Sequence, residues 1–307
     1  MRRTALLAVL ALLVLQGFAW ADGGFMPDER TWQQRRESAL INEPEQKAVV
    51  FFSAGTEQLI ISPSYEGDAT NFAWVVPVPA RPKVEILKGA IFHELARLVM
   101  PKPPADRLSK SRLLSPQAAG VKVLERKTVG AYDVSVLAAS DGNALMNWLK
   151  SNGYHLPDKA VEPIKGYVKD RWTFVACRIK VPGSAKGLKT GTLAPLRLTF
   201  KTPRPVYPVR LSAANPKPFI VEVYLVLRSV DIGAKPDRIS VAGIPGQRFH
   251  PHTKWAATAS GYPWNRSRYP TLAGLYDGEM QIYREWFYAE PAECRKDMVW
   301  TLPRSPR

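Results

Sequence analysis

The histidines are the side chains most able to do chemistry in this 307-residue chain. His250 and His252 flank a proline, so on an extended strand both rings would face one side. They could hold a metal ion with a third ligand such as His155 or Asp277. Two histidines alone do not complete a site that needs three or four ligands. A hydrolase with a metal-assisted site at His250 and His252 is therefore one hypothesis for the function.

Other catalytic signatures are incomplete. Zinc proteases carry His-Glu-x-x-His on a helix, but after His93 and Glu94 the second histidine position holds Arg97. Ser184 does not have the glycine spacing of a nucleophile elbow, and no Walker or dinucleotide-binding glycine loop occurs. We expect no cofactor, and the sequence favours a binding or structural protein over an enzyme.

The two cysteines allow two interpretations. Cys177 and Cys294 would form one structural disulfide in an oxidising compartment. Alternatively, Cys177 is an inert core thiol, because on a strand over residues 171–181 it shares a face with Val175 and Ile179. Both remain open, because the sequence does not show whether the two sites approach each other.

Aromatic side chains are concentrated near the carboxy terminus, where residues 255–300 hold ten of the 31 in the chain. Some alternate with arginine, as in Trp264, Arg266, Arg268 and Tyr269. Rings stack on apolar faces, and arginine pairs with carboxylate or phosphate. These four residues are candidates for binding an acidic glycan or polymer. The other interpretation is that the rings pack a loop-rich region onto a sheet.

A short apolar run over residues 72–78 ends in a series of prolines. Its length and its β-branched and aromatic content predict a strand buried on both faces. Proline lacks the N–H that a central ladder needs, so Pro77, Pro79 and Pro82 are expected to end the strand. Trp74 is either part of the core or part of an exposed ledge that docks a peptide or glycan.

Strands dominate the rest of the pattern. Residues 48–53 and 58–62 predict a hairpin, and a short amphipathic helix follows over residues 91–99. Further strands are expected over residues 121–128, 132–138, 171–181, 196–201 and 219–230. Two more helices are expected, one from Asp141 to an exit at Gly153 and one starting near Pro163. The fold class is α+β, mainly antiparallel sheet with a few short helices.

The chain begins with a targeting signal. Two arginines precede an apolar run over residues 5–15, and Ala19 and Ala21 supply the small residues of a cleavage site. Residues 1–21 therefore read as a secretory signal peptide, which predicts a periplasmic or extracellular protein. The apolar run is shorter than the roughly 20 residues that cross a bilayer. We expect no transmembrane anchor in the mature chain.

Several short blocks resemble a known family. They include residues 72–79, the pair Asn147-Trp148 followed by Gly153-Tyr154, residues 193–196 and residues 206–208. In this order they resemble the bacterial family of secreted proteins called DUF2330. We expect a domain of this family over residues 22–244. Its composition predicts a basic loop at 101–119, and the aromatic region 245–307 is expected to pack on the domain. The resemblance implies no activity, cofactor or catalytic residue.

The charge indicates the kind of partner. The formal net charge is +16, and it falls to +14 without the two arginines of the signal peptide. Such a basic exported protein attracts anionic envelope components such as wall polymers, lipid head groups or acidic glycans. Secretion and the absence of nucleic-acid-binding motifs argue against nucleic acid. We therefore expect an exported envelope protein that binds an anionic or glycan partner without catalysis.

Overall fold

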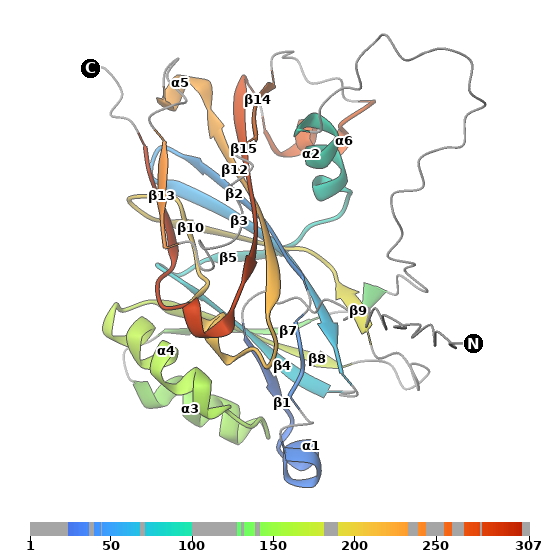
Figure 1. Cartoon of the computed structure of the whole chain (residues 1–307), viewed down its shortest axis with the longest axis vertical. Helices are drawn as coiled ribbons and strands as arrows, with labels where there is room; N and C mark the ends of the chain where they lie inside the picture. The colour runs from blue at the N-terminus through green and yellow to red at the C-terminus, as the bar shows by residue number, and fades with distance from the viewer. Residues whose placement is uncertain are drawn as a thin grey trace, which may run out of the picture.

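The computed structural model describes most of the chain, namely residues 24–36, 40–43, 45–67, 71–99, 128–129, 132–138, 142–180, 190–232, 239–243, 255–259, 267–276 and 278–302. Within these residues two β-sheets stack on each other, and helices cover part of the outer face of each (Figure 1). The sheets are mostly antiparallel, which confirms the predicted α+β class. No described helix has the length and apolarity needed to cross a membrane.

The smaller sheet is fully antiparallel, in the order β1-β4-β8-β7. Its strands are β1 (Gly24–Pro27), β4 (Asn71–Val78), β8 (Thr173–Lys180) and β7 (Asp133–Ala138). The prediction of a buried strand is confirmed, because β4 lies between two neighbours and Phe72 to Val76 are at most 2% exposed. β4 continues through Pro77, which pairs with β8 but lies beyond the end of β1. On the β1 side, no described strand therefore needs a hydrogen bond from Pro77, which has no N–H.

The larger sheet follows the order β14-β15-β12-β2-β3-β10-β5. Its strands are β14 (Trp255–Ala259), β15 (Met280–Ala289), β12 (Phe219–Arg228), β2 (Glu45–Ser53), β3 (Thr56–Glu66), β10 (Leu196–Lys201) and β5 (Lys83–Ile86). β9 (Thr190–Leu193) pairs antiparallel with the end of β3 and parallel with β6 (Thr128–Val129). The predicted hairpin is β2 and β3, and it turns at Ala54 and Gly55, which both have positive φ. The central pair, β2 and β12, is parallel.

The main core fills the space between the two sheets. Alternate residues of β4 and β8, including Trp74 and Cys177, face alternate residues of β2, β3 and β12, including Val50, Leu59 and Val223. Because successive side chains of a strand point to opposite faces of the sheet, every second residue of each strand points into this core. Parts of the opposite faces pack against helices.

The helices lie outside the sheets. The smaller sheet carries α3 (Gly142–Ser151), α4 (Asp158–Lys169) and the 3₁₀ helix η4 (Arg210–Ala214), and the larger sheet carries α2 (Ile91–Val99) and α6 (Pro270–Leu275). Glu94 is 3% exposed, and its carboxylate accepts the backbone N–H groups of Thr271 and Leu272 at 3.0 and 2.9 Å. Its role is thus to join α2 to the start of α6.

The start of α4 differs from the prediction. The helix begins at Asp158 and contains Pro163, instead of beginning near that proline. Proline fixes a φ that suits the helix and loses one backbone hydrogen bond. The buried side chains of Ala160, Ile164 and Tyr167 hold the helix on the sheet through the break. Tertiary packing therefore outweighs the local signal for a helix start.

The last strands form a small sheet with a buried ion pair beside it. The sheet consists of β11 (Val206–Tyr207), β16 (Met298–Thr301) and β13 (Ser240–Ala242), and the short helices α5 (Ser229–Ile232) and η6 (Pro291–Glu293) precede β13 and β16. The Asp297 side chain is 6% exposed and pairs with Arg210 Nε at 2.8 Å. It also accepts the backbone N–H groups of Val209 and Arg210 and the hydroxyl of Tyr167. These contacts join the carboxy-terminal strands to α4 and η4.

Glu57 is a second buried carboxyl group. It is 0% exposed at the start of β3, and one carboxyl oxygen accepts the backbone N–H of Val206 at 2.9 Å. Burial raises the pKa of Glu57 well above its ordinary value, against the smaller opposing effect of this hydrogen bond. The hydrogen bond links the larger sheet to β11.

Candidate functional site

A short surface helix, α1 (Glu29–Arg35), supplies one wall of the candidate site. Asp28 caps it, because its carboxylate accepts the N–H of Thr31 at 3.0 Å and the Thr31 hydroxyl at 2.5 Å. Glu29 and Gln33 are four residues apart and therefore share a helix face, where the Gln33 amide donates to the Glu29 carboxylate at 3.1 Å. No residue of α1 is buried, so this face is open to a ligand.

The other wall is the connection between α3 and α4. The chain leaves α3 through Gly153, whose φ of +75° matches the predicted left-handed exit. The next residues pair with the segment before α1: Glu29 donates its N–H to the Gly153 carbonyl at 2.7 Å, and His155 donates to the Pro27 carbonyl at 2.8 Å. This short ladder holds together two segments that are far apart in the sequence.

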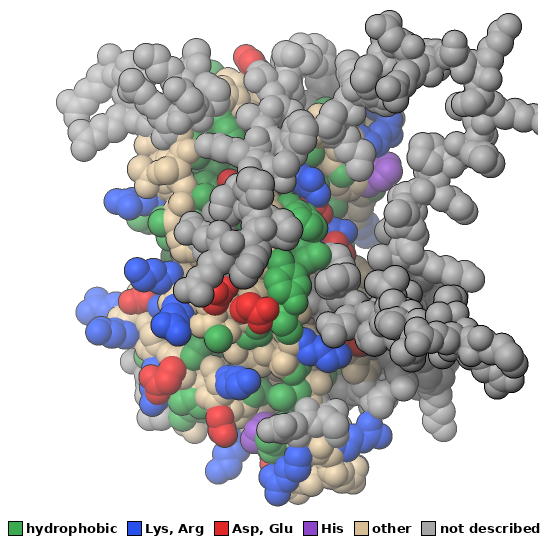
Figure 2. Space-filling view, in the orientation of Figure 1, with side chains coloured by type: hydrophobic (Ala, Val, Ile, Leu, Met, Phe, Trp, Pro, Cys, Tyr) green, Lys and Arg blue, Asp and Glu red, His purple; other side chains and the backbone are tan. Residues whose placement is uncertain are grey.

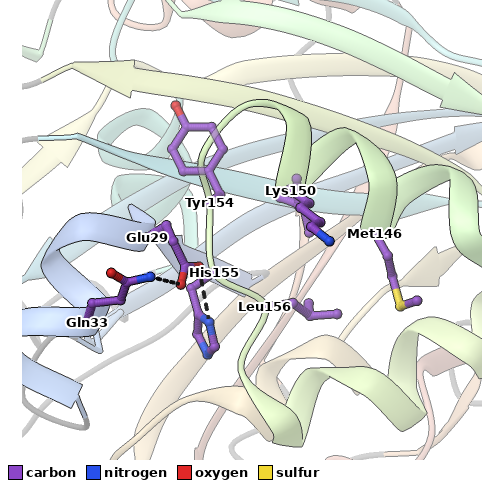
Figure 3. A pocket seen from close by; sticks show the side chains of 8 residues that line it. Glu29, Gln33, Met146, Lys150, Tyr154, His155 and Leu156 are labelled. Atoms are coloured by element: carbon purple, nitrogen blue, oxygen red, sulfur yellow. Dashed lines mark hydrogen bonds and ion pairs between the residues drawn. The ribbon is translucent and has the colours of Figure 1, made fainter.

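Between these walls lies an open pocket of about 520 Å³ (Figure 3). It is lined by Glu29, Gln33, Met146, Leu149, Lys150, Tyr154, His155 and Leu156. In Figure 3 the polar ends of Glu29, Gln33 and His155 lie on one side, while Met146 and Lys150 project from α3 on the other. The pocket therefore combines hydrogen-bonding groups, one cation and an apolar floor.

His155 is fixed in this pocket by two contacts. Its ring stacks on Trp32, with centroids 3.9 Å apart and an angle of 10° between the planes. Its Nδ1 lies 3.5 Å from a carboxylate oxygen of Glu29. The His155 side chain is 22% exposed, so part of the ring is available to a ligand. Stacking and the carboxylate together hold the imidazole in one orientation.

The pocket provides recognition groups, and its lining includes no serine, threonine or cysteine. Glu29 and His155 could exchange a proton with a ligand. In the part of the chain that the structure describes, no three His, Cys, Asp or Glu side chains are grouped as metal ligands. A flat stacked pair beside an amide, a carboxylate and an ammonium group suits a polyhydroxy ligand.

The sequence analysis missed most of this pocket. It considered His155 only as a third metal ligand, and it did not identify Glu29, Trp32, Gln33 or Lys150. The local signal was Asp28 followed by Thr31, which is a helix cap that introduces α1. No local pattern shows that α1 meets the end of α3, because the contact depends on backbone pairing between distant segments.

Three of the predicted binding residues fall within the described structure. Trp74 is 0% exposed and belongs to the core between the sheets, so the exposed-ledge alternative is corrected. The reason is that β4 has a packed layer on each face. Tyr269 is 9% exposed and packs at the junction of α2 and α6. Arg268 lies 5.6 Å and Arg97 5.9 Å from the centre of its ring.

The described carboxy-terminal aromatics mostly belong to the core. Five of them are at most 9% exposed: Tyr269, Tyr276, Tyr283, Phe287 and Trp300. Trp286 and Tyr288 on β15 are only partly buried. Packing onto the sheets therefore accounts for most of the aromatic side chains that can be placed.

The cysteines do not form the predicted disulfide. Cys177 and Cys294 are both buried and free. Burial raises the pKa of each thiol, so neither is an activated thiolate. Cys177 sits in the middle of β8 with its side chain in the core, which matches the alternative of an inert thiol.

The remaining predicted sites lie outside the described residues. They are Trp264, Arg266, His250, His252, Asp277, the signal peptide at 1–21 and the basic loop at 101–119. The strand expected over residues 121–128 is described only at its last residue. These remain predictions.

Comparison with known proteins identifies the family. The stacked sheets and flanking helices define an α+β protein of mainly antiparallel sheet. The chain belongs to the DUF2330 family, described as an uncharacterized protein conserved in bacteria, whose model matches residues 33–281. No curated protein matches the chain. A crystal structure of baculovirus P35 aligns with 86% of this chain and 97% of its own, at 10% identity and a TM-score of 0.39. That similarity is too low to transfer a fold or a function.

Proposed function

We propose that the protein is an exported, non-enzymatic binding module of the cell envelope whose pocket binds an acidic glycan. The His155 ring, which lines the pocket and is held there by stacking on Trp32, carries the proposal together with the hydrogen-bonding groups of Glu29 and Gln33. Aromatic rings contact the apolar faces of sugars, and carboxylate and amide groups bind hydroxyls.

Charge around the pocket favours an acidic ligand over a neutral one. Lys150 lines the pocket and is exposed, and Arg30, Arg35 and Arg36 on and after α1 are exposed as well. Figure 2 shows Lys and Arg side chains around the end of the molecule that carries α1. The net charge of +14 on the mature chain favours an anionic polymer in general, and these exposed cations contribute part of that charge at this end.

The test is binding of trigalacturonate, a soluble acidic oligosaccharide, to the mature chain by calorimetry at low and high salt. Trp32→Ala and Lys150→Ala should each weaken binding about tenfold, corresponding to about 1.4 kcal/mol. High salt should weaken binding of the wild-type protein. Circular dichroism checks that each variant remains folded.

Lys169→Ala is the matched control, because this exposed lysine at the far end of α4 changes the net charge equally. It should alter the dissociation constant less than twofold. Equal weakening by Lys150→Ala and Lys169→Ala would mean that charge alone attracts the ligand. That result, or no binding at low salt, would overturn the proposal.

A further inference from the structure

A second surface lies on the outer face of the larger sheet. β14 pairs with β15 only as far as Arg284, so beyond that residue β15 has no neighbour on that side among the described strands. Trp286 and Tyr288 lie beyond the described pairing with β14, and the period of two places both on one face of β15, about 7 Å apart. Phe287 between them points into the main core, which identifies their face as the outer one.

The neighbours of these two rings follow from the strand register. Trp286 lies opposite Glu222 of β12, which lies opposite Lys47 of β2. Tyr288 lies opposite Ile220, which lies opposite Glu45. We call this set the sheet platform: Glu45, Lys47, Ile220, Glu222, Arg284, Trp286 and Tyr288.

The helices cover the other half of this face. The apolar cluster beneath α2 and α6 reaches Val49 and Tyr224, and Lys47 and Glu222 lie two residues away on the same face of the same strands. Lys47 and Glu45 retain 32% and 34% of their side-chain exposure. Within the described structure, neither Trp286 nor Tyr288 makes a hydrogen bond or a ring contact. The rings are therefore held by the sheet without a polar or aromatic partner.

The charges on the sheet platform balance. Lys47 pairs with Glu45 at 2.6 Å, and Arg284 pairs with Glu222 at 2.7 Å. The Tyr224 hydroxyl donates to Glu222 at 2.7 Å and fixes that carboxylate. Two cations and two anions give no net attraction for an acidic ligand, in contrast to the pocket next to α1.

We propose that the sheet platform is a second binding site, and that it takes a neutral oligosaccharide. The two rings offer flat apolar contact, and the fixed ion pairs offer hydrogen bonds to hydroxyls without losing their own partners. An apolar protein partner would desolvate four charged groups, which is unfavourable. A nucleic acid would meet as many carboxylates as cations. A neutral sugar matches both the rings and the balanced charge.

The experiment uses the full mature chain and three neutral probes that differ in linkage: chitotetraose, cellotetraose and maltotetraose. Calorimetry should show saturable binding of at least one, with little change between low and high salt because the ligand carries no charge. Trp286→Ala should weaken that binding about tenfold, and Trp286→Phe should restore part of it because it keeps a ring. Urea unfolding of each variant checks that the fold is intact.

The variant Trp32→Ala separates this site from the pocket. It should leave the neutral probe unaffected while weakening trigalacturonate, and Trp286→Ala should do the reverse. If none of the neutral probes binds, or if Trp286→Ala leaves binding unchanged, the second site is refuted whatever the pocket does. If Trp32→Ala abolishes binding of the neutral probe, that sugar occupies the pocket and the proposal is equally overturned.

Discussion

Removal of the Asp297 carboxylate should be among the most destabilising single changes in this chain. The side chain is 6% exposed, and Arg210 at 2.8 Å is 18% exposed. Asp297→Ala leaves a largely buried guanidinium with Asp170 as its remaining carboxylate partner, beside the rings of Tyr167 and Trp172, and it removes the acceptor of two backbone N–H groups. Breaking a buried ion pair from one side costs about 3 to 5 kcal/mol, and we expect a loss of stability in that range.

The assay is urea unfolding, monitored by tryptophan fluorescence. The dependence of the unfolding free energy on urea concentration is compared between variants. Asp170→Ala is the matched control: it removes a carboxylate from the same arginine, but its side chain is 45% exposed, so about 0 to 1 kcal/mol is expected. Asp297→Asn keeps the shape and should lose an intermediate amount, about 1.5 to 3 kcal/mol. Equal stability of Asp297→Asn and wild type would show that the carboxyl is not charged in the folded protein. A loss below 1 kcal/mol for Asp297→Ala would refute the reasoning.

Two further predictions concern Glu57 and a pair of glycines. Burial raises the pKa of Glu57 above its ordinary 4.5, so its contribution to stability is complete below that pH. That contribution falls by about 1.4 kcal/mol per pH unit as the pH rises towards the folded-state pKa. Glu57→Gln should flatten this part of a profile of urea midpoints against pH, and parallel profiles would contradict the account. Gly243 and Gly278 both have φ of +83°, but a Cβ at Gly243 would lie 2.1 Å from the Asp297 backbone oxygen, while one at Gly278 would meet no described atom within 4 Å. Gly278→Ala should cost about 1 to 2 kcal/mol and Gly243→Ala about 1 to 3 kcal/mol more, measured by thermal unfolding; equal costs would remove the steric argument.

Local patterns predicted the strands because the order of apolar and polar residues along a strand reflects which of its faces are buried. β10 alternates buried and partly exposed side chains as expected, since Leu196, Leu198 and Phe200 face the core. β4 and β12 appear as continuous apolar runs, and both lie between two neighbouring strands. Short-range periodicity is therefore sufficient for the α+β class.

The candidate site was not predictable in the same way. The pocket arises where Glu29 pairs with Gly153 through the backbone, and no side-chain pattern encodes a contact of that kind. The presence of a tryptophan in a strand also did not show whether the side chain is buried or exposed. Trp74 fills the core while Trp286 lies on a partly open face, and the difference depends on what covers each strand.

The parallel pairing of β2 with β12 has a consequence for how the chain becomes folded. It joins residues near positions 48 and 223 at the centre of the larger sheet. The edge of β2 that does not pair with β3 therefore lacks its backbone hydrogen bonds until β12 has been synthesised. Contacts of such long sequence separation slow folding, and an unpaired apolar edge invites association with other chains. We expect slow refolding and a dependence on chaperones during synthesis. A chain truncated before β12 should give no folded half-protein.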